Sequence, residues 1–209
     1  MRSERTGYAQ RVQRYDPATA LIVVDLQNDF ADPAGGLSVA GGSRIVPRVN
    51  TEIEAAKAAG AGVFYTQDWH PESTPHFAKD GGIWPVHCVA GTWGAELHPD
   101  LIVDGPIVRK GANGEDGYSG FTMRDPTTGE TKPTELEGLV RERNITRLFV
   151  CGLATDYCVN ATAIDAKRLG FETSVLAHLC MPVNLRAGDD LRAIKQMESA
   201  GVDVLRPSS

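Results

Sequence analysis

Short runs of apolar and β-branched residues alternate with amphipathic helical patterns along most of this 209-residue chain. The run at residues 19–24 is followed by a helical pattern at 44–59 and then by a second apolar run at 62–66. Gly60 stands where the C-terminal cap of that helix is expected. This order is typical of a βαβ unit, in which a helix joins two parallel strands.

The same alternation continues toward the C-terminus. We expect further strands near residues 106–109 and at 147–152, 173–177 and 202–205, with helices near 134–143, at about 156–169 and around 189–200. The sequence therefore predicts an α/β fold: a three-layer, Rossmann-like, doubly wound and mainly parallel six-stranded sheet with helices on both faces. Ligand sites in such sheets lie beyond the carboxyl ends of the strands.

Composition narrows the class of protein. With 42% hydrophobic and 23% charged residues, we expect one domain over residues 1–209, made of an N-terminal extension at 1–18 and a core at about 19–206. The formal charge is −6 and no Lys/Arg run exceeds two residues, which argues against a nucleic-acid or membrane partner. The apolar runs are far shorter than the roughly 20 residues that span a bilayer, and the N-terminus does not resemble a signal peptide. Four cysteines without zinc-finger spacing indicate free thiols and a cytoplasmic location.

Two segments interrupt the alternation. Residues 67–100 hold all three tryptophans and four of the five histidines, and irregular connections of this length are usually functional. Residues 113–133 are rich in Gly, Thr and Asp, and their last ten residues predict an exposed turn or hairpin.

Three residues stand where strands end or a helix begins. Asp25 follows the first strand directly, although an aspartate there is often only a turn cap; Lys110 ends the third strand, where a surface lysine is the default interpretation. Cys158 falls in the first turn of the helix expected at 156–169, where free N–H groups and the helix dipole favour a thiolate. Cys151 and Cys180 are expected to be inert core thiols, and packing is also the commoner role of a lone cysteine such as Cys158.

A cluster of metal-ligand residue types lies in the first irregular segment. Asp68, His70, His76 and His87 have the spacing D-x-H-x5-H-x10-H, which suits an open mononuclear metal site. Nitrogen and oxygen donors accept zinc, manganese or iron, and we expect one divalent ion, with zinc first. The alternative is that these are scattered loop histidines.

Several motifs together carry a resemblance to a known family. They are DLQNDF at 25–30, QDWHPESTPHF at 67–77, WPVHC at 84–88, GAELHPDL at 94–101, RKG at 109–111, YSGF at 118–121 and GLATDYCV at 152–159. In this order they closely resemble the nicotinamidase/pyrazinamidase group of the isochorismatase-like cysteine hydrolases, over about residues 20–205. The resemblance implies an isochorismatase-like fold and a cytoplasmic enzyme of NAD metabolism that converts nicotinamide, or a close aromatic amide, to the acid and ammonia through a cysteine thioester.

The resemblance also implies roles for individual residues. Asp25, Lys110 and Cys158 match the catalytic triad, and Asp68, His70, His76 and His87 match the metal ligands. Phe30 and Trp84 match the walls around a pyridine ring, with Tyr118 near the pocket. The backbone N–H groups of Ala154 and Cys158 match the oxyanion hole, and a cis peptide bond is implied between Leu153 and Ala154.

Three other functions stay open at this point. The first is a related small-amide or carbamoyl hydrolase on the same Asp–Lys–Cys scaffold, against which the aromatic pair Phe30 and Trp84 argues. The second is a hydrolase in which metal-bound water attacks directly and Cys158 only packs. The third is a catalytically silent binder of metal and pyridine compounds. We expect a small-molecule substrate in every case, and a homo-oligomer stays open.

Overall fold

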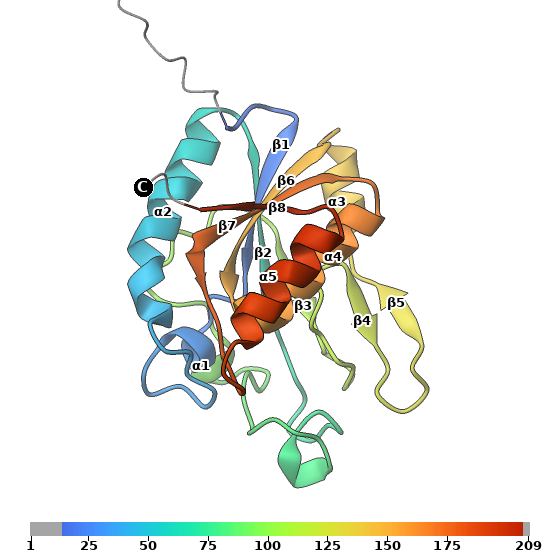
Figure 1. Cartoon of the computed structure of the whole chain (residues 1–209). Coiled ribbons are helices and arrows are strands. Elements are labelled where there is room, and N and C mark those ends of the chain that lie inside the picture. Colours follow the sequence, from blue (N-terminus) through green and yellow to red (C-terminus); the bar gives the residue numbers. More distant parts are fainter. Residues whose placement is uncertain (1–13, 207–209) are drawn as a thin grey trace, which may run out of the picture.

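The computed structural model describes residues 14–206 and shows six parallel strands between two layers of helices (Figure 1). The strands are β1 (Thr19–Val24), β2 (Gly62–Asp68), β3 (Ile107–Lys110), β6 (Arg147–Leu153), β7 (Glu172–Met181) and β8 (Asp203–Leu205), in the spatial order β3-β2-β1-β6-β7-β8. Every neighbouring pair is parallel. The predicted α/β class and six-stranded sheet are confirmed.

The helices follow from their apolar faces. In α2 (Gly42–Ala58), Ile45, Val49 and Ile53 are buried. The helix packs against one face of the sheet (Figure 1). The other face is covered by α3 (Leu136–Glu142), α4 (Asn160–Arg168) and α5 (Asp189–Ser199) (Figure 1). No helix within residues 14–206 is long and apolar enough to cross a membrane.

The order in which the chain adds strands reverses between the two central strands, β1 and β6. The chain runs from β1 outward through β2 to β3, and later from β6, on the other side of β1, outward through β7 to β8. Loops that leave β1 and β6 therefore diverge and open a crevice at the carboxyl ends of these strands. The short helix α1 (Asn28–Ala31) and the long connection after β2 lie at this edge (Figure 1).

The two irregular segments have little regular structure, as predicted. The connection after β2 contains only the 3-10 turns η1 (Ala78–Asp80) and η2 (Trp93–Ala95). The second segment forms the antiparallel hairpin of β4 (Thr122–Arg124) and β5 (Thr131–Pro133).

Most strands and helices lie within two residues of their predicted bounds, and two elements differ by more. Strand β7 continues four residues beyond the expected end at residue 177, after a shift of register opposite residues 150–152 of β6. The helix expected at about 156–169 begins with a π-helical turn, η3 (Thr155–Val159), before α4. Of the N-terminal extension expected at 1–18, residues 1–13 lie outside the described part; Tyr15 is buried with its ring edge-on to Phe149.

Candidate active site

Asp25, Lys110 and Cys158 meet at the carboxyl edge of the sheet. Asp25 follows β1, Lys110 is the last residue of β3, and Cys158 lies in η3 after β6. The ammonium nitrogen Nζ of Lys110 is 2.8 Å from Asp25 Oδ2 and 3.7 Å from Cys158 Sγ. Asp25 and Lys110 are fully buried, so the interpretation of Lys110 as a surface lysine is wrong.

Further polar contacts hold the buried charges in place. Lys110 Nζ also donates to a carboxylate oxygen of Asp68 and to the carbonyl oxygen of Gly117. The hydroxyl of Thr66, on β2, donates a 2.6 Å hydrogen bond to Asp25 Oδ1. The second oxygen of Asp25, Oδ2, faces the lysine. The Cys158 sulfur lies within 4.8 Å of an oxygen of the same carboxylate.

The environment shifts the pKa of each of the three groups. Burial raises the pKa of Asp25 to about 6, although the Lys110 ammonium opposes this shift. Burial disfavours the charged form of Lys110 as well, but Asp25 and Asp68 outweigh it and raise the pKa of the ammonium well above its usual range. An ammonium held between two carboxylates thus stays protonated at neutral pH.

The thiol does not behave as the helix-start argument predicts. Burial raises the pKa of Cys158 well above its usual range despite the opposing charge of Lys110. A helix dipole supplies at most about 2 kcal/mol, whereas burial can move a pKa by several units. The resting group is the thiol, so any nucleophilic role requires a base to remove its proton.

Backbone geometry after β1 and β6 shapes the site. Asp25 has φ of +46°, in the left-handed region that is uncommon for residues other than glycine. Gly152 has φ of +115°, and a Cβ atom there would lie 2.1 Å from the carbonyl oxygen of Val24, so only glycine fits between the two strands. The peptide bond between Leu153 and Ala154 is cis, as the resemblance implies.

A small cavity opens beside the thiol. It encloses about 400 Å³ of empty space, counting its open mouth. Phe30 and Trp84, predicted as walls, line it together with Tyr118, predicted near the pocket, and with Ala154 and Cys158. The indole N–H of Trp84 donates a 2.8 Å hydrogen bond to the Tyr118 hydroxyl, which joins these two lining residues.

Several cavity residues were not predicted, Gly117 among them. Tyr157 lines the cavity with its ring edge-on to Trp84 at 4.8 Å, and Leu37 and Val183 complete the apolar lining. The position of Tyr157 directly before Cys158 was a usable signal. Leu37 and Val183 come from loops after α1 and β7, and nothing in their local sequence marks them.

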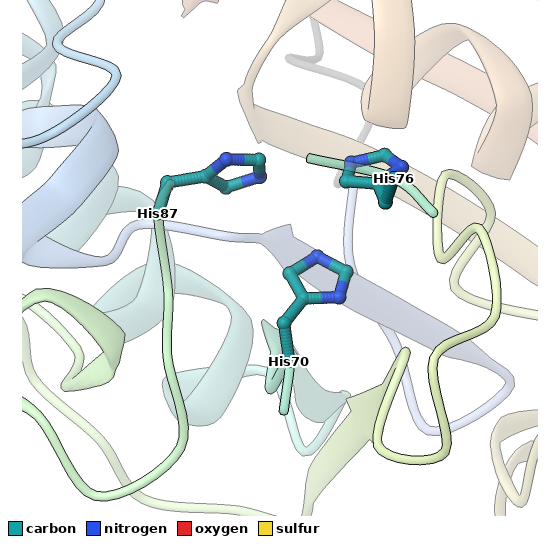
Figure 2. Close-up of side chains that lie close together, drawn as sticks. All are labelled: His70, His76 and His87. Carbon is teal, nitrogen blue, oxygen red and sulfur yellow. The ribbon is translucent and has the colours of Figure 1, made fainter. Parts of the chain in front are cut away.

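The three predicted histidines converge beside the cavity. His70, His76 and His87 place nitrogen atoms within 4.8 Å of one another, and Figure 2 shows their rings turned toward a common centre. Asp68 Oδ2 is 3.7 Å from His70 Nε2. The structure thus brings together all four predicted ligands.

The side chains of this cluster fit a metal ion. Both ring nitrogens of His70 are buried without a hydrogen-bond partner within residues 14–206, an arrangement that costs about 1–3 kcal/mol per group unless a ligand satisfies them. His87 Nδ1 donates to the carbonyl oxygen of Pro85 at 2.7 Å, which leaves Nε2 with its lone pair. Burial lowers the pKa of His87 to about 4, so this ring is neutral at neutral pH, as metal binding requires.

The remaining cysteines and histidines contribute little. Cys151 and Cys180 are buried and free, in agreement with their predicted role as packed thiols, and Cys88 is buried and free as well. His98 and His178 lie outside the histidine cluster.

Comparisons with known proteins give consistent matches. A family model described as the isochorismatase domain matches residues 19–207. The nicotinamidase of Escherichia coli is 36% identical over 88% of this chain and 93% of its own length. The nicotinamidase/pyrazinamidase of Mycobacterium tuberculosis is 37% identical over 89% and 97%.

Solved structures agree with these matches. The pyrazinamidase of Pyrococcus horikoshii in complex with zinc is 40% identical, with a TM-score of 0.81 over 91% of this chain and 100% of that one. PnC1 from L. infantum in complex with nicotinate is 35% identical, also with a TM-score of 0.81, over 91% and 93%.

Proposed function

The chain belongs to the isochorismatase family, and we propose on that premise that it is an amidase that hydrolyses nicotinamide to nicotinate and ammonia through a thioester on Cys158. The similarity to nicotinamidases over most of the chain supports this reaction. The single observation that carries the assignment of residues is the position of Lys110 Nζ between Asp25 and Cys158, whose side chain lines an aromatic cavity.

Acylation of the enzyme starts from a protonated thiol. Asp25 Oδ2 removes the proton from Cys158 Sγ, and the thiolate attacks the carboxamide carbon. The carbonyl oxygen gains negative charge and is stabilised by the backbone N–H groups of Ala154 and Cys158. The carbon–nitrogen bond then breaks, Asp25 returns the proton to the departing nitrogen, and ammonia leaves.

Hydrolysis of the thioester reverses these roles. Asp25 removes a proton from water, the resulting hydroxide attacks the acyl carbon, and the carbon–sulfur bond breaks to release nicotinate. The proton that Asp25 holds restores the thiol. Lys110 keeps its charge throughout and stabilises both the carboxylate and the thiolate.

The cavity selects a flat aromatic substrate. Phe30, Trp84 and Tyr118 offer apolar and aromatic surface to a pyridine ring, from which an aliphatic amide gains little. The carboxamide then points toward Cys158, whose side chain lines the same cavity.

The chain holds a divalent metal at Asp68, His70, His76 and His87, and we assign zinc to this site, with manganese and iron as alternatives. A set of three imidazoles and one carboxylate is compatible with all three ions. When bound, such an ion supplies a Lewis acid that can hold a ring nitrogen and polarise water.

Organisation and location complete the proposal. We assign the chain to one hydrolase domain with a core at residues 19–206 that acts on a small molecule in the cytoplasm, without a nucleic-acid or membrane partner. The four free cysteines support a reducing compartment.

Ammonia release over a panel of nicotinamide, pyrazinamide, an aliphatic amide and an N-carbamoyl compound tests the substrate assignment. Nicotinamide should give a kcat/KM well above those of the last two. A preference for the carbamoyl compound would instead identify a carbamoyl hydrolase.

Hydroxylamine tests the thioester. It should divert part of the turnover to the hydroxamate, because it competes with water for the same acyl group. Acid quenching should show a nicotinoyl mass increment on the peptide that contains Cys158. The matched control is Cys180→Ala, a buried free thiol outside the cavity, which should keep both signals. Retention of turnover in Cys158→Ala within about tenfold, only about 1.4 kcal/mol of barrier, would indicate direct attack by metal-bound water.

A further inference from the structure

One short segment between β3 and β4, residues 114–118, contacts the buried lysine, the histidine cluster and the aromatic wall of the site. Its contacts are the Gly114 carbonyl with Thr74 Oγ1 at 3.0 Å, the Asp116 carboxylate with His76, the Gly117 carbonyl with Lys110, and the Tyr118 hydroxyl with Trp84. Three of these partners belong to the segment that carries the histidines and the aromatic wall. Of the four contacts, only the one from Asp116 reaches a side chain of the histidine cluster.

The contact of Asp116 fixes which nitrogen of His76 carries hydrogen. Asp116 Oδ1 is 2.8 Å from His76 Nδ1. A carboxylate oxygen accepts hydrogen bonds, so Nδ1 is the donor and Nε2 of the neutral ring keeps its lone pair. A metal ion needs that lone pair.

Asp116 is itself held in place by backbone hydrogen bonds to the hairpin. Its backbone N–H donates to the carbonyl oxygen of Arg124 at 2.7 Å, and its carbonyl oxygen accepts from the N–H of Arg124 at 3.0 Å. Arg124 is the last residue of β4, so the hairpin fixes the backbone from which the carboxylate projects. The side chain of Asp116 is only 16% exposed.

The other two histidines lack such a partner. His87 donates only to a backbone carbonyl, and His70 has no hydrogen bond to either ring nitrogen within residues 14–206. His70 is instead stacked on His76, with ring centroids 4.8 Å apart and planes inclined by 24°. A shift of the His76 ring would therefore also remove support from His70.

We propose that Asp116 is a positioning residue of the metal site, which selects the tautomer and orientation of His76 and thereby raises metal affinity. This inference rests on the metal site assigned above. Carboxylate partners of metal-binding histidines act in this way, and their loss typically costs 10- to 100-fold in affinity or activity.

The test measures metal affinity rather than turnover. Apoprotein is titrated with zinc against a chromogenic chelator, for the parent and for Asp116→Ala, Asp116→Asn and Glu115→Gln. Glu115 is the matched control: it is an adjacent buried acid, but its carboxylate accepts from Asn113 and not from a histidine.

Asp116→Ala should weaken zinc binding by about 10- to 100-fold. Asp116→Asn should weaken it less, by about 3- to 10-fold, because the amide oxygen still accepts from Nδ1 while the charge is lost. Glu115→Gln should stay within about twofold of the parent. A cobalt-substituted Asp116→Ala protein should show an altered visible spectrum, since the geometry of a ligand changes.

Zinc affinity of Asp116→Ala within about twofold of the parent would overturn the inference and leave the metal site intact. If that variant does not fold, as circular dichroism of the apoprotein would reveal, unchanged affinity in Asp116→Asn overturns it equally. A parent protein that binds no zinc, manganese or iron would overturn the metal site itself, and this inference with it.

Discussion

Replacing Thr66 with valine removes one hydrogen bond and leaves the shape of the side chain nearly unchanged. The Thr66 hydroxyl donates to Asp25 Oδ1 at 2.6 Å in a fully buried site, and a hydrogen bond to a charged group contributes about 1.5–3 kcal/mol. Because the donor stabilises the ionised carboxylate, its loss should raise the pKa of Asp25. At about 1.4 kcal/mol per unit, that pKa should rise from about 6 by about 1 to 2 units.

The sign of the effect on turnover follows from the role of Asp25 as a base. The base acts when it is deprotonated, so kcat/KM of the parent should fall as the pH drops below about 6. In Thr66→Val the acidic limb should lie at higher pH by about 1 to 2, so that kcat/KM at pH 6.5 falls roughly 3- to 25-fold and recovers near pH 9.

The assay is a pH profile of kcat/KM for ammonia release. Thr66→Ser keeps the hydroxyl and should restore the parent profile. Thr162→Val is the matched control. Thr66 and Thr162 are both fully buried and both lie beside Gly120, but the Thr162 hydroxyl accepts a hydrogen bond from the Gly120 N–H instead of donating one to Asp25. An acidic limb of folded Thr66→Val that coincides with that of the parent would refute the reasoning.

Four other substitutions give sharp expectations. Cys158→Ala should lower kcat/KM by more than about 1,000-fold and leave the metal content intact, as checked by elemental analysis. His76→Ala should lose most of the metal, measured in the same way; full retention would contradict the site. Trp84→Ala should lower kcat/KM for nicotinamide about tenfold or more beyond its effect on an aliphatic amide, whereas equal losses would indicate a packing role. Gly152→Ala should lower the free energy of unfolding in urea by more than about 2 kcal/mol, because the alanine Cβ would collide with the Val24 carbonyl oxygen. An unchanged free energy of unfolding would mean that β1 and β6 can move apart at little cost.

Local sequence signals placed two site residues at strand ends, but only the family resemblance gave them roles. Asp25 and Lys110 each stand at the end of a predicted strand, and parallel strands bring their carboxyl ends to one edge. The histidines are recognisable because they cluster in a chain that has few others. None of these inferences needs the relative placement of distant segments.

Residues that act through tertiary contacts had no such signal. Asp116 lies in a Gly- and Asp-rich stretch whose composition indicates only a turn, and its partner His76 is 40 positions away. The sequence pattern indicates only that Thr66 is a buried strand residue, and its hydrogen-bond partner Asp25 is 41 positions away. Periodicity places such residues on a face of the sheet but does not reveal what they touch.

The prediction that the helix start favours a thiolate at Cys158 differs from the structure for another reason, because burial raises the pKa of the thiol. The helix start was recognised, but a helix end stabilises a thiolate only modestly, and the depth of burial that outweighs it depends on packed neighbours from several segments. The cysteine therefore relies on Asp25 to become reactive.

The residues that we propose break the amide bond and those that we propose select the substrate lie on different kinds of structure. Asp25 and Lys110 are fixed by the hydrogen-bonded ends of β1 and β3, whereas Trp84 and Val183 come from loops. Loops accept substitution and insertion far more readily than paired strands. A directed-evolution library that varies the cavity-facing loop positions and preserves the strand ends should yield amidases for new substrates, since such a scaffold can diverge in specificity without rebuilding its chemistry.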